Sequence, residues 1–235
     1  MENNTIKNIF KVTAMACFIA LASNAVAGPS ANVQVKGSVK TGACTPTLDN
    51  GGVVDYGDIS TDLLSTSANQ MPQKKLNLNI SCTNETVISV SVKDNRNSSL
   101  RFIEIKNAYA NNSTSNTTMQ QFGLGKTKTG TNIGAYVISL DQTTLINEGT
   151  QLDAIVKDDA ESEWVKASGA RAAGSTMSNN SRKWSFASTG TLTPTAIKSI
   201  AIPLKISMAL PMESALNITE LTNLDGNATF NINYL

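Results

Sequence analysis

Apolar and polar residues alternate along the last part of the chain. Between Gly226 and Tyr234 every second residue is small or apolar, and the residues between them are Asn and Thr. A period of two over this length is the pattern of a β-strand with one buried face. The residues expected on that face are Gly226, Ala228, Phe230, Ile232 and Tyr234, and Leu235 follows with a free carboxylate.

Alternation of the same kind predicts strands through most of the chain. The clearest further runs are residues 75–82 and 200–210; other candidates are residues 87–92, 101–106, 135–140 and 184–187. Clusters of Gly, Asn, Ser and Thr separate the runs, as turns do in a β-sandwich. The chain is therefore predicted to be all-β. The one stretch that resembles a helix, residues 152–173, is polar and uneven, and residues 107–118 are expected to be a surface excursion too polar to bury.

The first 27 residues have the pattern of a secretory signal peptide. Lys7 and Lys11 precede a short apolar run at residues 14–22, and small residues at Ala25 and Ala27 mark a cleavage site. The apolar run is too short to span a bilayer as a stable helix. We expect residues 1–27 to be removed on export, which leaves about 200 residues, enough for one domain.

Removal of this leader changes both the net charge and the cysteine count. The whole chain has a net charge of +1, and the leader contains Glu2, Lys7 and Lys11, so the mature chain is neutral. A neutral chain without basic runs offers no electrostatic surface for nucleic acid. Cys44 and Cys82 remain, and in an oxidising compartment we expect them to form a disulfide. Closing a loop of this length stabilises a fold by about 4 kcal/mol in the chain-entropy description.

Signals of catalysis and metal binding are nearly absent. The chain has no histidine, which excludes a Ser-His-Asp triad, a Cys-His pair and a histidine-ligated metal. Trp164 and Trp184 could stack on a sugar, but tryptophans of a β domain more often pack in the core. We therefore predict a protein that is not an enzyme and that uses no cofactor or metal.

A second alternating segment follows the predicted cleavage site. Within residues 28–40, Val33, Val35, Gly37 and Val39 share one face, and the run leads into Cys44. With the features at the other end, this segment resembles the N-terminal extension of chaperone–usher pilins.

The resemblance covers both ends of the chain and the cysteine pair. In that family an alternating extension with a glycine precedes the first cysteine, the second cysteine ends an alternating strand, and the last strand has a tyrosine next to its end. The matching residues here are Gly37, Cys44, Cys82 and Tyr234, with a Val-Asp-Tyr-Gly segment at residues 54–57.

The resemblance implies an incomplete immunoglobulin-like β-sandwich over residues 41–235, whose missing strand comes from another protein. A periplasmic pilus chaperone would lend this strand first. The N-terminal extension of a neighbouring pilin subunit would then replace it at the outer-membrane usher. In this scheme Val33, Val35, Gly37 and Val39 form the donor strand, and the chaperone binds the C-terminal strand, Gly226 to Leu235.

The function implied is that of a structural subunit of a bacterial surface fimbria, exported through the periplasm and supporting adhesion. Two alternatives stay open. A self-contained periplasmic or secreted β-sandwich that binds carbohydrate would need a closed sheet, with residues 28–40 as a dispensable tail. A tip adhesin would need a further receptor-binding domain, for which about 200 residues leave too little room.

Overall fold

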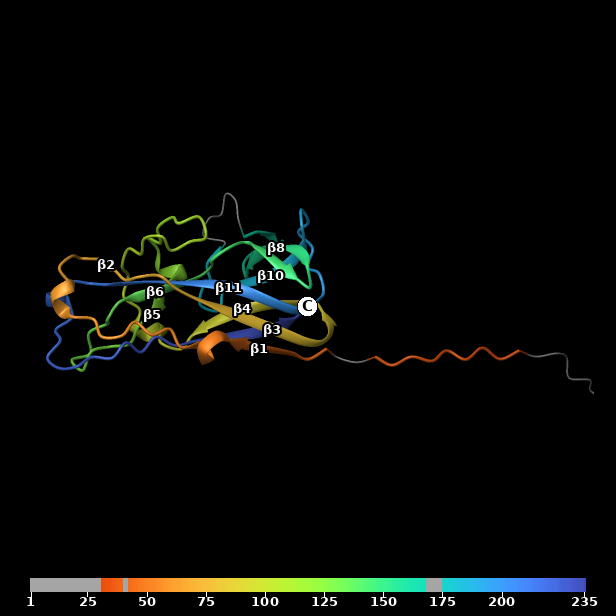
Figure 1. Cartoon of the computed structure of the whole chain (residues 1–235), viewed down its shortest axis with the longest axis horizontal. Coiled ribbons are helices and arrows are strands. Elements are labelled where there is room, and N and C mark those ends of the chain that lie inside the picture. The colour runs from red at the N-terminus through yellow and green to blue at the C-terminus, as the bar shows by residue number, and fades with distance from the viewer. Residues whose placement is uncertain (1–30, 40–41, 168–174) are drawn as a thin grey trace, which may run out of the picture. The chain divides into compact units, whose positions relative to one another are not determined.

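The folded part of the chain is built from β-strands and short 3-10 turns (Figure 1). The computed structural model describes residues 31–39, 42–167 and 175–235. These residues contain no α-helix and therefore no helix that could cross a membrane. The all-β prediction is confirmed, and the described part of the stretch that resembled a helix contains β8 (Thr150–Asp158) and β9 (Val165–Lys166). The predicted signal peptide lies outside the described residues.

Sheet A contains both cysteines. Its strand order is β1 (Cys44–Leu48), β3 (Lys74–Thr86), β11 (Ile197–Leu210), β6 (Ala135–Leu140) and β5 (Phe122–Gly123), and β2 (Asn69–Gln70) also pairs with β11. All of these pairs are antiparallel. Cys44 lies opposite Cys82 in the β1–β3 register, and a disulfide joins them as predicted.

Sheet B contains the C-terminal strand. Its order is β12 (Ala228–Tyr234), β4 (Ile88–Asp94), β10 (Arg182–Ser188), β8 and β7 (Thr144–Asn147), and β9 also pairs with β8. All of its ladders are antiparallel as well. Among the described residues β12 pairs with β4 alone, so it is an edge strand.

One apolar core lies between the two sheets, because the strands of each sheet turn their apolar residues inward. Sheet A contributes residues of β3 and β11, and sheet B contributes residues of β4 and β10. Among the most deeply buried are Leu78, Ile80, Ile202, Leu204, Val90, Val92, Trp184 and Phe186. Each such side chain stabilises the fold by about 1.5–3 kcal/mol through its burial.

The strand order corresponds to an immunoglobulin-like sandwich that lacks one strand. In the complete fold one sheet has the order A-B-E-D, and the other has strand F between strands C and G. Here β1, β3, β11 and β6 occupy the A, B, E and D positions, while β4 and β12 occupy C and F. The G position, on the free edge of β12, holds no strand among the described residues. The predicted incomplete sandwich is confirmed.

The long segment between β4 and β6 covers the outer face of sheet A. Ile103, Ile105 and Tyr109 form a second apolar cluster with residues of β6 and β11. The buried Lys205 ammonium of β11 donates a hydrogen bond of 2.7 Å to the Tyr109 carbonyl. The prediction that residues 107–118 are too polar to bury was wrong at Ala108, Tyr109 and Ser115, which are all buried, and Ala108 and Tyr109 supply the apolar contact.

The disulfide generates the first prediction. Substituting both Cys44 and Cys82 by Ser should lower the free energy of unfolding by about 2–5 kcal/mol, because the unfolded chain gains the entropy of an open loop. Urea unfolding of the mature protein with and without reductant measures this. Addition of reductant should destabilise the wild type and leave the double variant unchanged. Equal stability of the two oxidised proteins would contradict a structural role for the bond.

Candidate strand-binding groove

An apolar groove of about 860 Å³ lies beside the first part of β12. One wall is the segment after β1, within residues 52–61, and the other is residues 221–230, which lead into and begin β12. The floor is the inner face of sheet A, including Tyr136, Ile138, Leu204, Ile206 and Met208. The groove therefore occupies the position where the fold lacks its strand.

The β12 wall is incompletely covered. Phe230 and Ile232 pack against the core, yet each is only half-buried. A strand added at the free edge would cover such residues and would pair with the backbone groups that β4 leaves unpaired. Gly226 brings the wall close to the floor, since a Cβ atom there would lie 3.0 Å from a ring carbon of Tyr136.

The opposite wall belongs to neither sheet, but its burial alternates as in a strand. Val54 and Tyr56 pack against the core, whereas Val53, Asp55 and Gly57 are exposed. The Tyr56 hydroxyl donates a hydrogen bond of 3.4 Å to the Ile206 carbonyl of the floor. Burial raises the pKa of Tyr56 to about 12, so the hydroxyl stays protonated and keeps its role as donor.

The C-terminal end of β12 differs from the prediction. Tyr234 was expected on the buried face, but it is 56% exposed. Its hydroxyl accepts a hydrogen bond of 2.9 Å from the Cys44 backbone N–H, which ties the end of β12 to the start of β1. Leu235 is also exposed, and its N–H bonds to the Val87 carbonyl. At this end of the open edge no strand among the described residues covers Tyr234.

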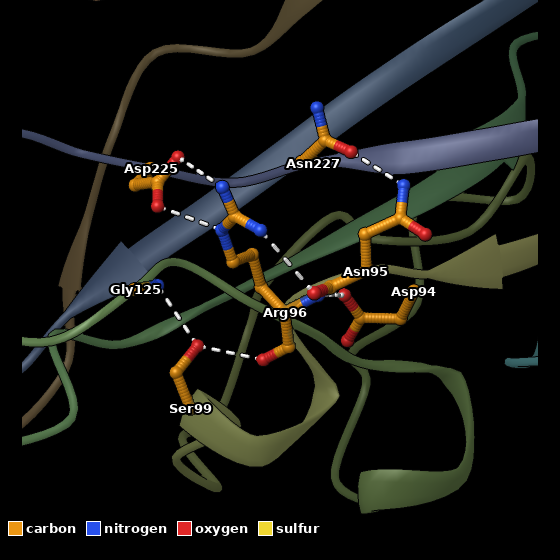
Figure 2. Close-up of polar contacts among 7 residues, drawn as sticks. All are labelled: Asp94, Asn95, Arg96, Ser99, Gly125, Asp225 and Asn227. Atoms are coloured by element: carbon orange, nitrogen blue, oxygen red, sulfur yellow. Dashed lines mark hydrogen bonds and ion pairs between the residues drawn. The ribbon is translucent and has the colours of Figure 1, made fainter.

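A polar cluster holds the other end of β12, and Figure 2 shows Arg96 reaching from the turn after β4 to Asp225. The guanidinium donates two hydrogen bonds to the carboxylate, of 2.7 and 3.0 Å. The Asn95 side chain bonds to that of Asn227, and the Asn95 N–H bonds to the Asn227 carbonyl at 2.9 Å. The segment that leads into β12 is thus fixed to the end of β4 by both side chains and backbone.

The largely buried carboxylate of Asp94 fixes the backbone on which this cluster is built. Asp94 accepts hydrogen bonds from the backbone N–H groups of Arg96 and Gly123, at 2.7 and 2.9 Å. Burial raises the pKa of Asp94, although these bonds oppose the increase. The Arg96 guanidinium instead holds the pKa of Asp225 below its ordinary value. The exposed pair is therefore ionised over a wide range of pH.

The residues predicted to form the donor strand lie in the separate unit that ends at Val39. Residues 31–39 contain no paired strand and are exposed throughout. Val33 and Val35 are 89% and 94% exposed, which is unusual for apolar side chains at alternating positions.

The described residues form neither a metal site nor a sugar-stacking platform. They contain no group of three or more His, Cys, Asp or Glu side chains that could hold a metal ion. Trp184 is fully buried in the core, so it cannot form a sugar-stacking platform with Trp164. The Lys157 ammonium lies 5.3 Å from the ring centroid of Trp164.

Sequence comparison links the whole chain to a known family. Protein GltF of Escherichia coli K12 is 32% identical over 100% of this chain and 98% of its own length. The chain belongs to the GltF family. The uncharacterised protein YhcF of the same organism is 29% identical over 98% of this chain and 100% of its own length. A family model described as a protein of unknown function (DUF1120) matches residues 33–137.

Two solved structures resemble this chain weakly. One is a chaperone–usher pilus structure, with a TM-score of 0.34 and 11% identity over 89% of this chain and 98% of the other. The second is the P pilus rod subunit PapA, with a TM-score of 0.32 and 12% identity over 81% and 99%.

The polar cluster generates the second prediction. Asp225→Asn should lower the urea midpoint of unfolding slightly at pH 7, because it removes the charge partner of Arg96. The pKa of Asp225 is depressed in the folded state, so its stabilisation is present above the unfolded pKa and is lost as pH falls through the lower folded value. The difference from wild type should therefore shrink as pH falls and vanish once Asp225 is protonated in the folded state as well.

Lys128→Met is the matched control, because Lys128 forms an exposed pair with Glu220 and neither residue belongs to the cluster that anchors β12. Amide exchange of β12 should increase in Asp225→Asn and stay unchanged in this control. Unchanged exchange in both variants would contradict the anchoring role of Asp225.

Proposed function

We propose that this protein is a structural, non-enzymatic subunit of a bacterial surface fimbria, and that the groove beside β12 receives a β-strand from another protein. The observation that carries the proposal is the free edge of β12 above an apolar floor. A strand bound there would act by β-augmentation, in which main-chain hydrogen bonds give affinity and side-chain pockets give specificity.

The open groove supports a role in assembly, because an isolated protein with this exposed edge would be prone to aggregate. An unpaired edge strand beside exposed apolar surface favours aggregation. The proposed solution is a periplasmic pilus chaperone that lends a strand during export. The extension of a neighbouring subunit then replaces the chaperone's strand at the outer-membrane usher.

The exposed extension has the composition that such a donor needs. If Val33, Val35 and Val39 enter the groove, their burial contributes about 1.5–3 kcal/mol each before the cost of ordering the segment. Because donor and groove are different surfaces of one subunit, the contact is heterologous and does not have to close into a ring. Its repetition gives a filament, which would carry adhesion at the cell surface.

The C-terminal residues are suited to recognition by the chaperone. Tyr234 and Leu235 are both more than half exposed, so the terminal carboxylate lies at an accessible end of the open edge. Basic residues of a chaperone could hold this carboxylate through charge-assisted bonds worth about 1.5–3 kcal/mol. Such a contact would also set the register of the lent strand.

The third prediction tests this function at the C-terminus. Addition of a short tag after Leu235 should prevent capture by the cognate chaperone, because the carboxylate moves away from the end of β12. The measurement is the soluble periplasmic level of the subunit, together with its co-purification with the chaperone. Tyr234→Ala should weaken capture in the same direction.

The control carries the same tag in the loop at Gly130, which has a positive φ and open space around it. This insertion should leave capture unchanged. Equal capture of the wild type and the C-terminally tagged subunit would contradict the proposal. A stable monomer that needs no chaperone would instead favour the self-contained carbohydrate-binding sandwich.

A further inference from the structure

We propose that Lys205 and Asn112 form a covalent crosslink, an amide bond between the two side chains that joins β11 to the segment over the outer face of sheet A. This modification goes beyond the proposed function, since it involves neither the groove nor a partner protein. The contact that carries it is the one between the Lys205 amine and the Asn112 carboxamide, which lie 3.1 Å apart from nitrogen to oxygen.

Lys205 is a buried nucleophilic side chain that faces away from the core. Its neighbours in β11, Leu204 and Ile206, belong to the core between the sheets, so alternation turns Lys205 to the outer face of sheet A. Lys205 is only 2% exposed there. A lysine buried to this extent is normally paired with a charged partner. Lys205 instead donates to two neutral oxygens, the Tyr109 carbonyl at 2.7 Å and Oδ1 of Asn112, and forms no ion pair with a described residue.

The surroundings of this amine favour its neutral form. Burial lowers the pKa of Lys205; the charge of Asp141 opposes this decrease and the charge of Lys75 adds to it. The Asp141 carboxylate is itself bound to the Lys75 ammonium at 2.7 Å. A desolvated lysine amine with a lowered pKa is an activated nucleophile.

A tight turn holds the carboxamide against the amine. The Asn112 N–H bonds to the Tyr109 carbonyl at 2.8 Å, and the same carbonyl accepts the hydrogen bond from Lys205. Asn112 has a φ of 62°, in the left-handed region that asparagine tolerates better than most residues. The turn therefore wraps around the end of the lysine side chain. Two groups held in one geometry react far faster than the same groups free in solution.

The reaction exchanges one amide for another and is balanced without an oxidant or a cofactor. The Nζ lone pair of Lys205 attacks Cγ of Asn112, and the bond from Cγ to Nδ2 breaks. Nδ2 leaves as ammonia with the proton that Nζ gives up, and the new amide joins Nζ to Cγ. Asn112 is exposed, so the ammonia escapes to solvent while the amine behind it stays enclosed.

The fourth prediction concerns the mass of the mature protein. The wild type should be about 17 Da lighter than its sequence with one disulfide, because the attack on the carboxamide releases one ammonia. Lys205→Met and Asn112→Ala should each have their full sequence mass. Lys75→Met is the matched control, since it removes an exposed lysine paired with Asp141, and it should keep the deficit. A tryptic digest of the wild type should contain a branched peptide that joins Lys205 to Asn112.

The Lys205→Met variant separates the crosslink from the other reaction that removes ammonia, the cyclisation of an asparagine to a succinimide. A succinimide does not use Lys205, so it would keep the deficit in this variant. A wild-type protein of full sequence mass, or a deficit that persists in Lys205→Met, would overturn the proposal.

The fifth prediction concerns the denatured chain. The crosslink closes a loop between residues 93 positions apart, and unlike the disulfide it survives boiling in SDS with reductant. The wild type should therefore migrate faster than Asn112→Ala on a denaturing gel, because a closed loop keeps an unfolded chain more compact. Asn112 is exposed, so its substitution does not disturb the core. Equal migration of the two reduced proteins would show that hydrogen bonds alone hold the two segments together.

Discussion

The free edge of β12 is the constraint on which the rest of the structure depends. A sandwich normally covers both edges of its inner strands, but here β12 pairs on one side alone among the described residues. Phe230 and Ile232 therefore stay half-buried, and Phe230 lines the apolar groove. The open edge of β12 and the groove beside it mark the position where the fold lacks its strand.

Contacts between distant parts of the chain hold both ends of β12 and one wall of the groove. The disulfide and the Tyr234–Cys44 hydrogen bond hold one end, and the Arg96–Asp225 pair holds the other. Tyr56 ties the opposite wall to the floor. The groove is thus a preorganised site, and preorganisation lowers the cost of ordering a bound strand.

The sequence predicted the parts of the molecule that depend on local alternation. Alternation predicted the strands at residues 75–82, 200–210 and 226–234. The sequence also predicted the pairing of the two cysteines, which lie opposite each other in β1 and β3. Alternation could not reveal that Tyr234 is exposed at the open edge, because a strand pattern does not show on which side a strand lacks a neighbour. The Arg96–Asp225 pair was also missed, since 129 residues separate the partners and neither lies in a motif.

Amide hydrogen exchange of β12, measured with and without the peptide of residues 31–39, tests the central claim most directly. Without peptide, the N–H groups of β12 that do not bond to β4 should exchange quickly, because they face an open groove. Bound peptide should protect these groups and leave the amides of β7, at the opposite edge of sheet B, unchanged. Slow exchange along the whole of β12 without peptide, or no protection at a saturating concentration, would contradict the account.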